Sequence, residues 1–226
     1  MSSMVSIEPR INLKFFRIAA KYINLIKLNL WEIAITLRGA GYELTQRLPP
    51  PKFRAIIGGV GPIAQKQNVI VDINTEARVI GVVSPSIEDA IREFNLIEEL
   101  FKKDLMLELK PHFYEVLFEA EIYTKNNPIK ILNTIGENLG ITSKLSKLIK
   151  NLNLSLWGIR LCKKFGSPDD ADWYEIEIIP SINRSTKAYY TSIVYRKQNR
   201  DDVIKFSKNL LDFTKKLLTE LEALAS

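Results

Sequence analysis

The chain has 226 residues, of which 46% are hydrophobic and 26% charged, and its formal net charge at pH 7 is +6. This length suits one large domain or two of about 100 residues, and the composition is ordinary for a globular protein. No apolar run approaches the roughly 18 residues of a membrane span, and the single cysteine, Cys162, excludes an internal disulfide and a thiolate metal cluster. We therefore expect a cytoplasmic protein with no membrane partner. The Ile-, Lys- and Glu-rich composition is typical of thermophiles.

The first half predicts a strand, a helix, three or four further strands and a long helix. An alternating apolar run predicts the first strand at 13–23. Residues 29–41 predict a helix that Asn29 caps and that ends at Gly39 and Gly41. Further strands are expected over four segments: 42–48, 53–59, 68–74 and 78–84. The long helix is expected over 86–105, with Ser86 as its cap and acidic residues in its first turn.

Two glycine-containing steps raise the question of a phosphate-binding loop. The first, GGVGP at 58–62, lacks the spacing of a P-loop, and a strand rather than a helix follows it. We therefore predict a turn between strands at Gly61–Pro62. The second, RVIGVV, places Gly81 inside a strand, where a close packing contact or a bulge is expected.

The second half predicts the same order of elements. A strand is expected over 113–123, followed by a helix over 127–140 with Asn127 as cap and Pro128 at the first helical position. The next segment, 143–154, has a helical pattern. Strands are then expected over three segments, with a turn at Ser167–Pro168 after the first: 157–165, 173–179 and 188–196. A single long helix over 199–224 closes the chain, with Asp201 and Asp202 in its first turn.

This repeated order predicts an α+β fold of two tandem β-α-β(3-4)-α repeats. Residues 1–10 are expected to be a tail, 11–109 the first repeat and 110–226 the second. Two such repeats can join edge to edge into one curved antiparallel sheet with the helices on one face.

The arrangement resembles the duplicated, saddle-shaped fold of the TATA-box-binding protein family over nearly the whole chain. The similarity is best in the first repeat. Three segments there resemble the family's first helix, its central strand and the hairpin that leads into its long helix: LNLWEIAITLRGAGYE (28–43), PKFRAIIGGV (51–60) and NVIVDINTEARVIGVVSPSIEDA (68–90). The resemblance implies a concave sheet face that meets a partner.

The family's DNA-contact residues are poorly matched. Its paired wedge phenylalanines have at most Phe53 and Trp157 as counterparts, and its groove-reading asparagines have no clear match. We therefore expect a fold of this kind without TATA-type recognition, since fold alone does not fix function.

Strand alternation places six carboxylates on the predicted concave face: Asp72, Glu115, Glu119, Glu121, Glu175 and Glu177. Such a face would repel a DNA duplex and could bind a protein partner. Two alternatives are a divalent cation held by these oxygens and cross-strand ion pairs with Arg17, Lys21, Arg160 or Arg196.

Basic residues gather elsewhere, mainly on predicted helices and loops. The candidate phosphate contacts are Lys144, Lys147, Lys150, Arg160, Lys163, Lys164, Arg196 and Lys197. The alternative is a solvated surface without a nucleic-acid role.

Residues for catalysis are scarce. The only histidine, His112, follows a proline at the repeat boundary, and we expect it to be a surface linker residue. With one histidine and one cysteine, the chain lacks the residues for a base–nucleophile pair or a zinc site. We predict no catalytic residue, metal or cofactor, and a binding protein in nucleic-acid transactions. The alternative is a protein-interaction scaffold that uses the acidic face. A homodimer contact through Tyr189, Ile193 and Tyr195 is a further expectation.

Overall fold

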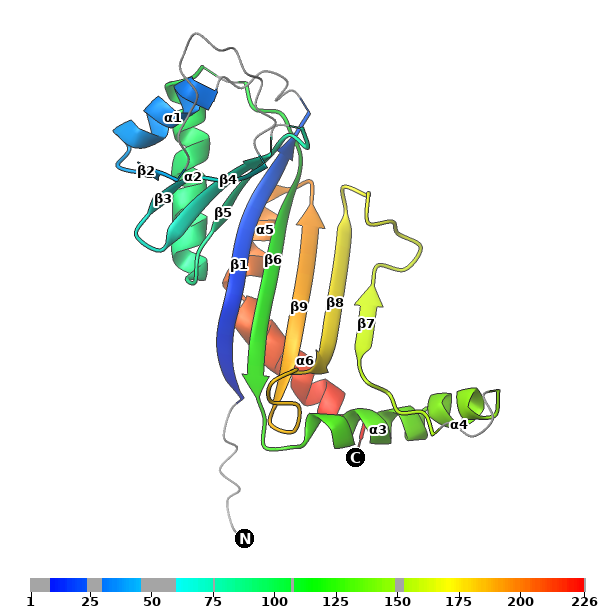
Figure 1. Cartoon of the computed structure of the whole chain (residues 1–226). Coiled ribbons are helices and arrows are strands. Elements are labelled where there is room, and N and C mark those ends of the chain that lie inside the picture. The colour runs from blue at the N-terminus through cyan, green and yellow to red at the C-terminus, as the bar shows by residue number, and fades with distance from the viewer. Residues whose placement is uncertain are drawn as a thin grey trace.

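The computed structural model describes residues 9–23, 30–45, 60–74, 76–106, 108–148 and 153–225. They form an α+β fold with one open antiparallel sheet of nine strands and six helices (Figure 1). The predicted α+β class is confirmed. Asn29, Phe53 and the predicted strand at 53–59 lie outside the described residues.

The two longest strands form the centre of the sheet. The strands are β1 (Arg10–Tyr22), β2 (Glu43–Leu44), β3 (Val60–Lys66), β4 (Val69–Asn74), β5 (Val79–Val83), β6 (Pro111–Tyr123), β7 (Ile159–Cys162), β8 (Trp173–Pro180) and β9 (Ala188–Lys197). Their order is β2-β3-β4-β5-β1-β6-β9-β8-β7, and all paired strands are antiparallel. Outward from the central β1–β6 pair, three strands in reverse chain order follow on each side, and β2 adds a short edge.

Helices cover one face of this sheet. They are α1 (Leu30–Gly39), α2 (Ile87–Lys103), α3 (Pro128–Asn138), α4 (Ile141–Ser146), α5 (Arg200–Lys208) and α6 (Leu210–Ala223). Helices α2, α5 and α6 lie on the same side of the sheet, and α3 and α4 extend from its lower end in Figure 1. No helix within the described ranges is long and apolar enough to cross a membrane.

The caps predicted at Ser86 and Asn127 begin α2 and α3, and Asn199 caps α5 in the same way. Ser86 Oγ accepts a hydrogen bond from the backbone N–H of Asp89 at 3.2 Å, and Asn127 Oδ1 accepts one from Ile129 at 3.1 Å. Asn199 Oδ1 accepts a hydrogen bond from the N–H of Asp201 at 2.8 Å. Each cap satisfies an N–H group that has no partner within its own helix.

A single apolar core lies between the sheet and the helices. Alternate residues of the central strands, such as Phe16 and Ile18 of β1 and Val116 and Phe118 of β6, are fully buried beneath the helices. Phe16 lies directly opposite Phe118 in the register. Since one cluster of buried side chains draws on both halves of the chain, the halves share their core.

The predicted dimer contact is wrong for the residues named. Tyr189 and Ile193 are buried in the core, and the Tyr195 ring stacks on Phe206 of α5 with a centroid distance of 4.0 Å. The alternation of β9 turns these three side chains toward the helices, and only the half-buried Tyr195 keeps part of its surface accessible.

The predicted turn at Gly61–Pro62 is also wrong, because both residues belong to β3. The register between β3 and β4 is irregular between Pro62 and Ala64, and a bulge tolerates a proline that cannot donate to the ladder. The turn lies instead at Gln67 and Asn68, where Gln67 has a φ of 53°.

The predicted long C-terminal helix is two helices. Asn209 separates α5 from α6 with φ −99° and ψ 4°, and its Nδ2 donates to the carbonyl of Lys205 at 2.8 Å. Asparagine weakens a helix interior because its side chain competes for backbone hydrogen bonds.

The buried carboxylate of Glu98 links the two halves of the chain on the helix-covered side of the sheet. Glu98 of α2 is 3% exposed and accepts hydrogen bonds from Tyr22 Oη of β1 at 2.7 Å and from Arg200 Nε of α5 at 3.1 Å. Arg200 also donates to Asn95 Oδ1. Burial and the nearby Glu98 charge raise the pKa of Tyr114 to about 12. This network ties α2 to α5, and thus holds the two halves of the sheet in one orientation.

Candidate functional site: the open face of the sheet

We call the face opposite α2, α5 and α6 the open face. The register places all six predicted carboxylates on it. Asp72 lies opposite Gly81, Gly81 opposite Ala19, and Ala19 opposite Glu115. The other four carboxylates follow at alternate positions of β6 and β8: Glu119, Glu121, Glu175 and Glu177.

These carboxylates are largely neutralised by cations from neighbouring strands and from one loop. The pairs are Arg17 with Asp72 at 2.7 Å, Arg196 with Glu115 at 2.6 Å, Arg160 with Glu175 at 2.5 Å, and Lys14 and Arg184 with Glu121 at 2.9 and 3.7 Å. The alternative of cross-strand pairing is therefore confirmed for Arg17, Arg160 and Arg196. Lys21 and Arg10, which lies opposite Tyr123, add positive charge to the same face. Among the described residues the open face is therefore approximately charge-balanced rather than acidic.

Gly81 makes room for one of these pairs. Arg17 of β1 and Asp72 of β4 flank β5, and their side chains meet above Gly81. A Cβ atom at Gly81 would lie 2.4 Å from Asp72 Oδ1 and 2.7 Å from Arg17 Nε. The predicted close packing contact at Gly81 is thus confirmed, and its cause is a cross-strand ion pair.

Replacing Gly81 by alanine is expected to separate this pair. Because the added methyl group must displace charged side chains, we expect a loss of about 1–3 kcal/mol in unfolding free energy. Gly39→Ala at the end of α1 is the matched control, since its Cβ meets no atom within 4 Å. Urea unfolding of both variants measures the difference, and equal stabilities would refute the assignment of Gly81.

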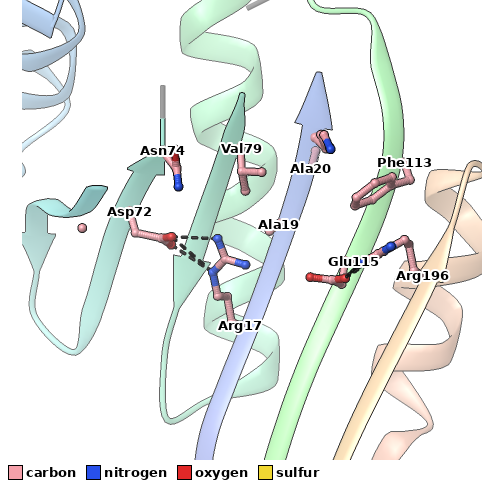
Figure 2. Close-up of a pocket in the computed structure, with 11 residues that line it drawn as sticks. Arg17, Ala19, Ala20, Asp72, Asn74, Val79, Phe113, Glu115 and Arg196 are labelled. Atoms are coloured by element: carbon pink, nitrogen blue, oxygen red, sulfur yellow. Dashed lines mark hydrogen bonds and ion pairs between the residues drawn. The ribbon is translucent and has the colours of Figure 1, made fainter. Parts of the chain in front are cut away.

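A hollow of about 390 Å³ lies on the open face beside this pair. Its floor contains Ala19, and its rim includes Arg17, Asp72, Asn74, Phe113, Glu115 and Arg196 (Figure 2). The Phe113 ring lies 4.2 Å from the Arg196 guanidinium carbon and 5.7 Å from Lys21 Nζ, which are cation–π distances. Figure 2 shows the Arg17 guanidinium turned toward Asp72 and the Glu115 carboxylate beside Arg196 on the other side of β1.

Tyr190 lies among the remaining carboxylates of the face. It stands opposite Glu121 and Ile179 in the register. Its pKa is raised, first by burial and then by a hydrogen bond to Glu119 and by the charge of Glu177. This hydroxyl therefore stays protonated and donates to Glu119.

Glu121 is the most enclosed carboxylate of the open face, at 7% exposure. It accepts a hydrogen bond from Ser181 Oγ at 2.7 Å and pairs with Lys14 at 2.9 Å. The Ser181 hydrogen bond, followed by the one from Lys14, lowers the pKa of Glu121.

Glu121→Gln is expected to lower stability at neutral pH and to remove part of its pH dependence. A carboxylate with a lowered folded-state pKa contributes stability above its unfolded pKa of about 4.3, which is lost as the pH falls through the folded value. We expect a difference from the native chain of about 1–2 kcal/mol at pH 7 that shrinks toward pH 2–3. Denaturant unfolding across this pH range measures it. A difference independent of pH would contradict the assignment.

The predicted nucleic-acid residues fall into two groups. Those of the first group lie on or beside β7 and β9, and each pairs with a carboxylate of this chain: Arg160, Lys163, Arg196 and Lys197. Lys197, for example, lies 2.6 Å from Asp172 and lowers the pKa of that carboxyl. Arg196 is also held by the carbonyls of Pro168 and Asp170 at 2.6 and 3.0 Å. These four cations already have partners within the chain and are not free to bind phosphates.

The second group is more accessible. Lys144 and Lys147 are exposed on and just after α4, and neither has an ion-pair partner among the described residues. Lys164 lies over the exposed Phe165 ring at 5.0 Å. Lys150 lies outside the described residues.

Of the two possible DNA wedges, Trp157 and Phe53, only Trp157 is among the described residues. Trp157 is 55% exposed and precedes β7, and Phe53 lies outside the described residues. His112, predicted as a linker residue, instead lies within β6 with its ring 5.4 Å from that of Phe113. No group of three or more potential metal ligands occurs within the described ranges.

Several residues of the open face were missed by sequence reasoning. Phe113 precedes Glu115 by two positions on β6, so strand alternation alone could have placed it on this face. Strand alternation could not assign Lys14 to this face, because the register of β1 against β6 shifts between Leu13 and Phe15. Arg184 lies in the turn after β8, where no periodic signal exists.

No family model matches the chain, and no curated protein matches it either.

Proposed function

We propose that this is a non-enzymatic binding protein whose open face holds a protein partner, in a fold of two tandem repeats like that of the TATA-box-binding protein family. The mirrored strand order about the β1–β6 pair supports the repeats. The three segments of the first repeat that resemble the family support a saddle-shaped sheet. The single cysteine supports a cytoplasmic setting.

The charge balance of the open face carries this proposal. A surface that binds DNA through phosphates needs cations that are free to displace counterions. Here Arg17, Arg196 and Arg160 are held by Asp72, Glu115 and Glu175. Half-buried apolar side chains such as Leu117 and Val194, which are direct neighbours, lie between the ion pairs. Mixed apolar and paired polar surface is typical of protein interfaces.

The size of the face suits such a partner. Nine strands about 4.8 Å apart span roughly 40 Å, and eight residues of a strand span roughly 26 Å. The resulting area of about 1,000 Å² is comparable to the roughly 800 Å² that each partner contributes to a standard interface.

Capture experiments with matched variants test the proposal. The tagged native chain, Leu117→Arg on the open face and Ile35→Arg on α1 are used to capture proteins from nuclease-treated lysate of its cells. Ile35 is 65% exposed, so its substitution adds the same charge without touching the open face. We expect a protein retained by the native chain and by Ile35→Arg but lost with Leu117→Arg. Equal retention by all three would refute the open face as the docking surface.

Nucleic-acid binding at α4 is the second candidate function. Lys144 and Lys147 favour it, since they are exposed and have no ion-pair partner in the described part of the chain. The adjacent Leu145 and Leu148 are 47% and 77% exposed, so a partner covering this segment meets apolar as well as basic surface.

Fluorescence anisotropy with random duplex, TATA duplex and single-stranded DNA tests this candidate. Two phosphate contacts would weaken affinity about tenfold between 50 and 200 mM salt. The double variant Lys144→Glu/Lys147→Glu should abolish binding, whereas Lys102→Glu/Lys103→Glu at the end of α2 should retain it. Absence of binding at low salt would remove this candidate.

A further inference from the structure

We propose that the hollow on the open face binds a small zwitterion, an α-amino acid, through its carboxylate and ammonium groups. The inference goes beyond the proposed function, because a small ligand can occupy the hollow whether or not a protein docks on the face. It depends on hydrogen-bonding groups of Arg17, Lys21 and Glu115 that the ion pairs around the hollow do not use.

The anion end is provided by Arg17 and Lys21. Arg17 uses Nε and Nη2 to bind Asp72, at 3.2 and 2.7 Å, so Nη1 has no hydrogen-bond partner among the described residues. Lys21 lies four residues along β1 on the same face, and within the described chain its ammonium contacts only the Phe113 ring. Two donors therefore stand on either side of Ala19, whose small side chain leaves space between them.

The cation end is provided by Glu115. It lies directly opposite Ala19 on β6. Its Oε2 accepts both hydrogen bonds of Arg196, at 2.8 and 2.6 Å, so Oε1 is left without a partner among the described residues. The Arg196 pair also holds this carboxylate in one orientation. An ammonium group in the hollow would complete the hydrogen bonding of Oε1.

The shape of the hollow fits a ligand of this size. Its volume of about 390 Å³ is within the range of small-molecule sites. Val79 and Phe113 supply apolar wall for a ligand side chain. Opposite charges lie on the rim, with Arg17 and Lys21 on β1 and Glu115 opposite Ala19 on β6 (Figure 2). They match the two charges of an amino acid and disfavour a simple anion or a simple amine.

The test uses the full chain labelled with ¹⁵N and each of the twenty protein amino acids at 10 mM. We expect at least one amino acid to shift the amide resonances of Ala19, Lys21 and Glu115 in a saturable manner. Its analogue without the ammonium group, and its analogue without the carboxylate, should each bind at least tenfold more weakly. No saturable shift with any amino acid, or an analogue that binds equally well, would overturn the inference.

Variants locate the site and separate this inference from the proposed function. Lys21→Gln should weaken amino-acid binding at least tenfold, whereas Lys205→Gln on the exposed side of α5 should leave it unchanged. Unaltered binding in Lys21→Gln would place the ligand elsewhere and refute the site. A chain that binds no amino acid yet captures a protein through Leu117 would refute this inference alone. Amino-acid binding without capture would refute only the proposed function.

Discussion

Replacing Glu98 by alanine is expected to lower the free energy of unfolding by about 3–5 kcal/mol. Glu98 is nearly inaccessible, and its two oxygens accept hydrogen bonds from Tyr22 and Arg200. Its removal leaves the Arg200 guanidinium partly enclosed with no opposite charge, and leaves the Tyr22 hydroxyl buried with no acceptor. The penalty arises from these groups rather than from the net value of the pair.

The neighbouring residue supplies the control. Glu99 lies on the exposed side of α2, where it pairs with Lys103 at 3.7 Å and its side chain is 65% exposed. Glu99→Ala should change stability by less than about 0.5 kcal/mol. Urea unfolding followed by circular dichroism measures both variants. Equal effects would show that Glu98 does not hold α2 to α5.

The second large effect is expected at Phe118, whose replacement by alanine should lower stability by about 3–5 kcal/mol. Phe118 is fully buried and faces Phe16 across the β1–β6 junction, so a cavity there lies within the core of both halves. Because the halves share that core, we expect them to lose stability together. Hydrogen exchange of β4 and β8 amides should accelerate by the same factor.

Leu117→Ala is the matched control for this cavity. Leu117 is the adjacent residue on the open face and is only half-buried, so its truncation should have a much smaller effect. If Phe118→Ala accelerated exchange in β8 but not in β4, the two halves would be independent folding units, contrary to the single core.

Local patterns in the sequence were sufficient to predict most elements. Strand alternation in β6 separated the buried Val116 and Phe118 from the open-face Glu115, because one covered face imposes a period of two. Caps such as Ser86 and Asn127 marked helix starts through local side-chain chemistry. Both signals act over a few residues, so a single sequence contains them.

Other features depend on which strands become neighbours. The charge balance of the open face required the pairs of Arg17 with Asp72 and of Arg196 with Glu115, which are 55 and 81 residues apart in the chain. Pro62 looked like a turn residue because proline cannot donate to a sheet, but a bulge accommodates it. Asn209 interrupts a helix whose apolar pattern continues on both sides.

Site-specific photocrosslinking in cells is the most direct test of a protein-binding open face. The chain carries p-benzoylphenylalanine at position 117, at position 35 as the control on α1, or at position 147 after α4. We expect a discrete, nuclease-resistant protein adduct from position 117 and none from position 35. A nuclease-sensitive adduct at position 117, or protein adducts from position 147 alone, would contradict the assignment of the open face as the partner surface.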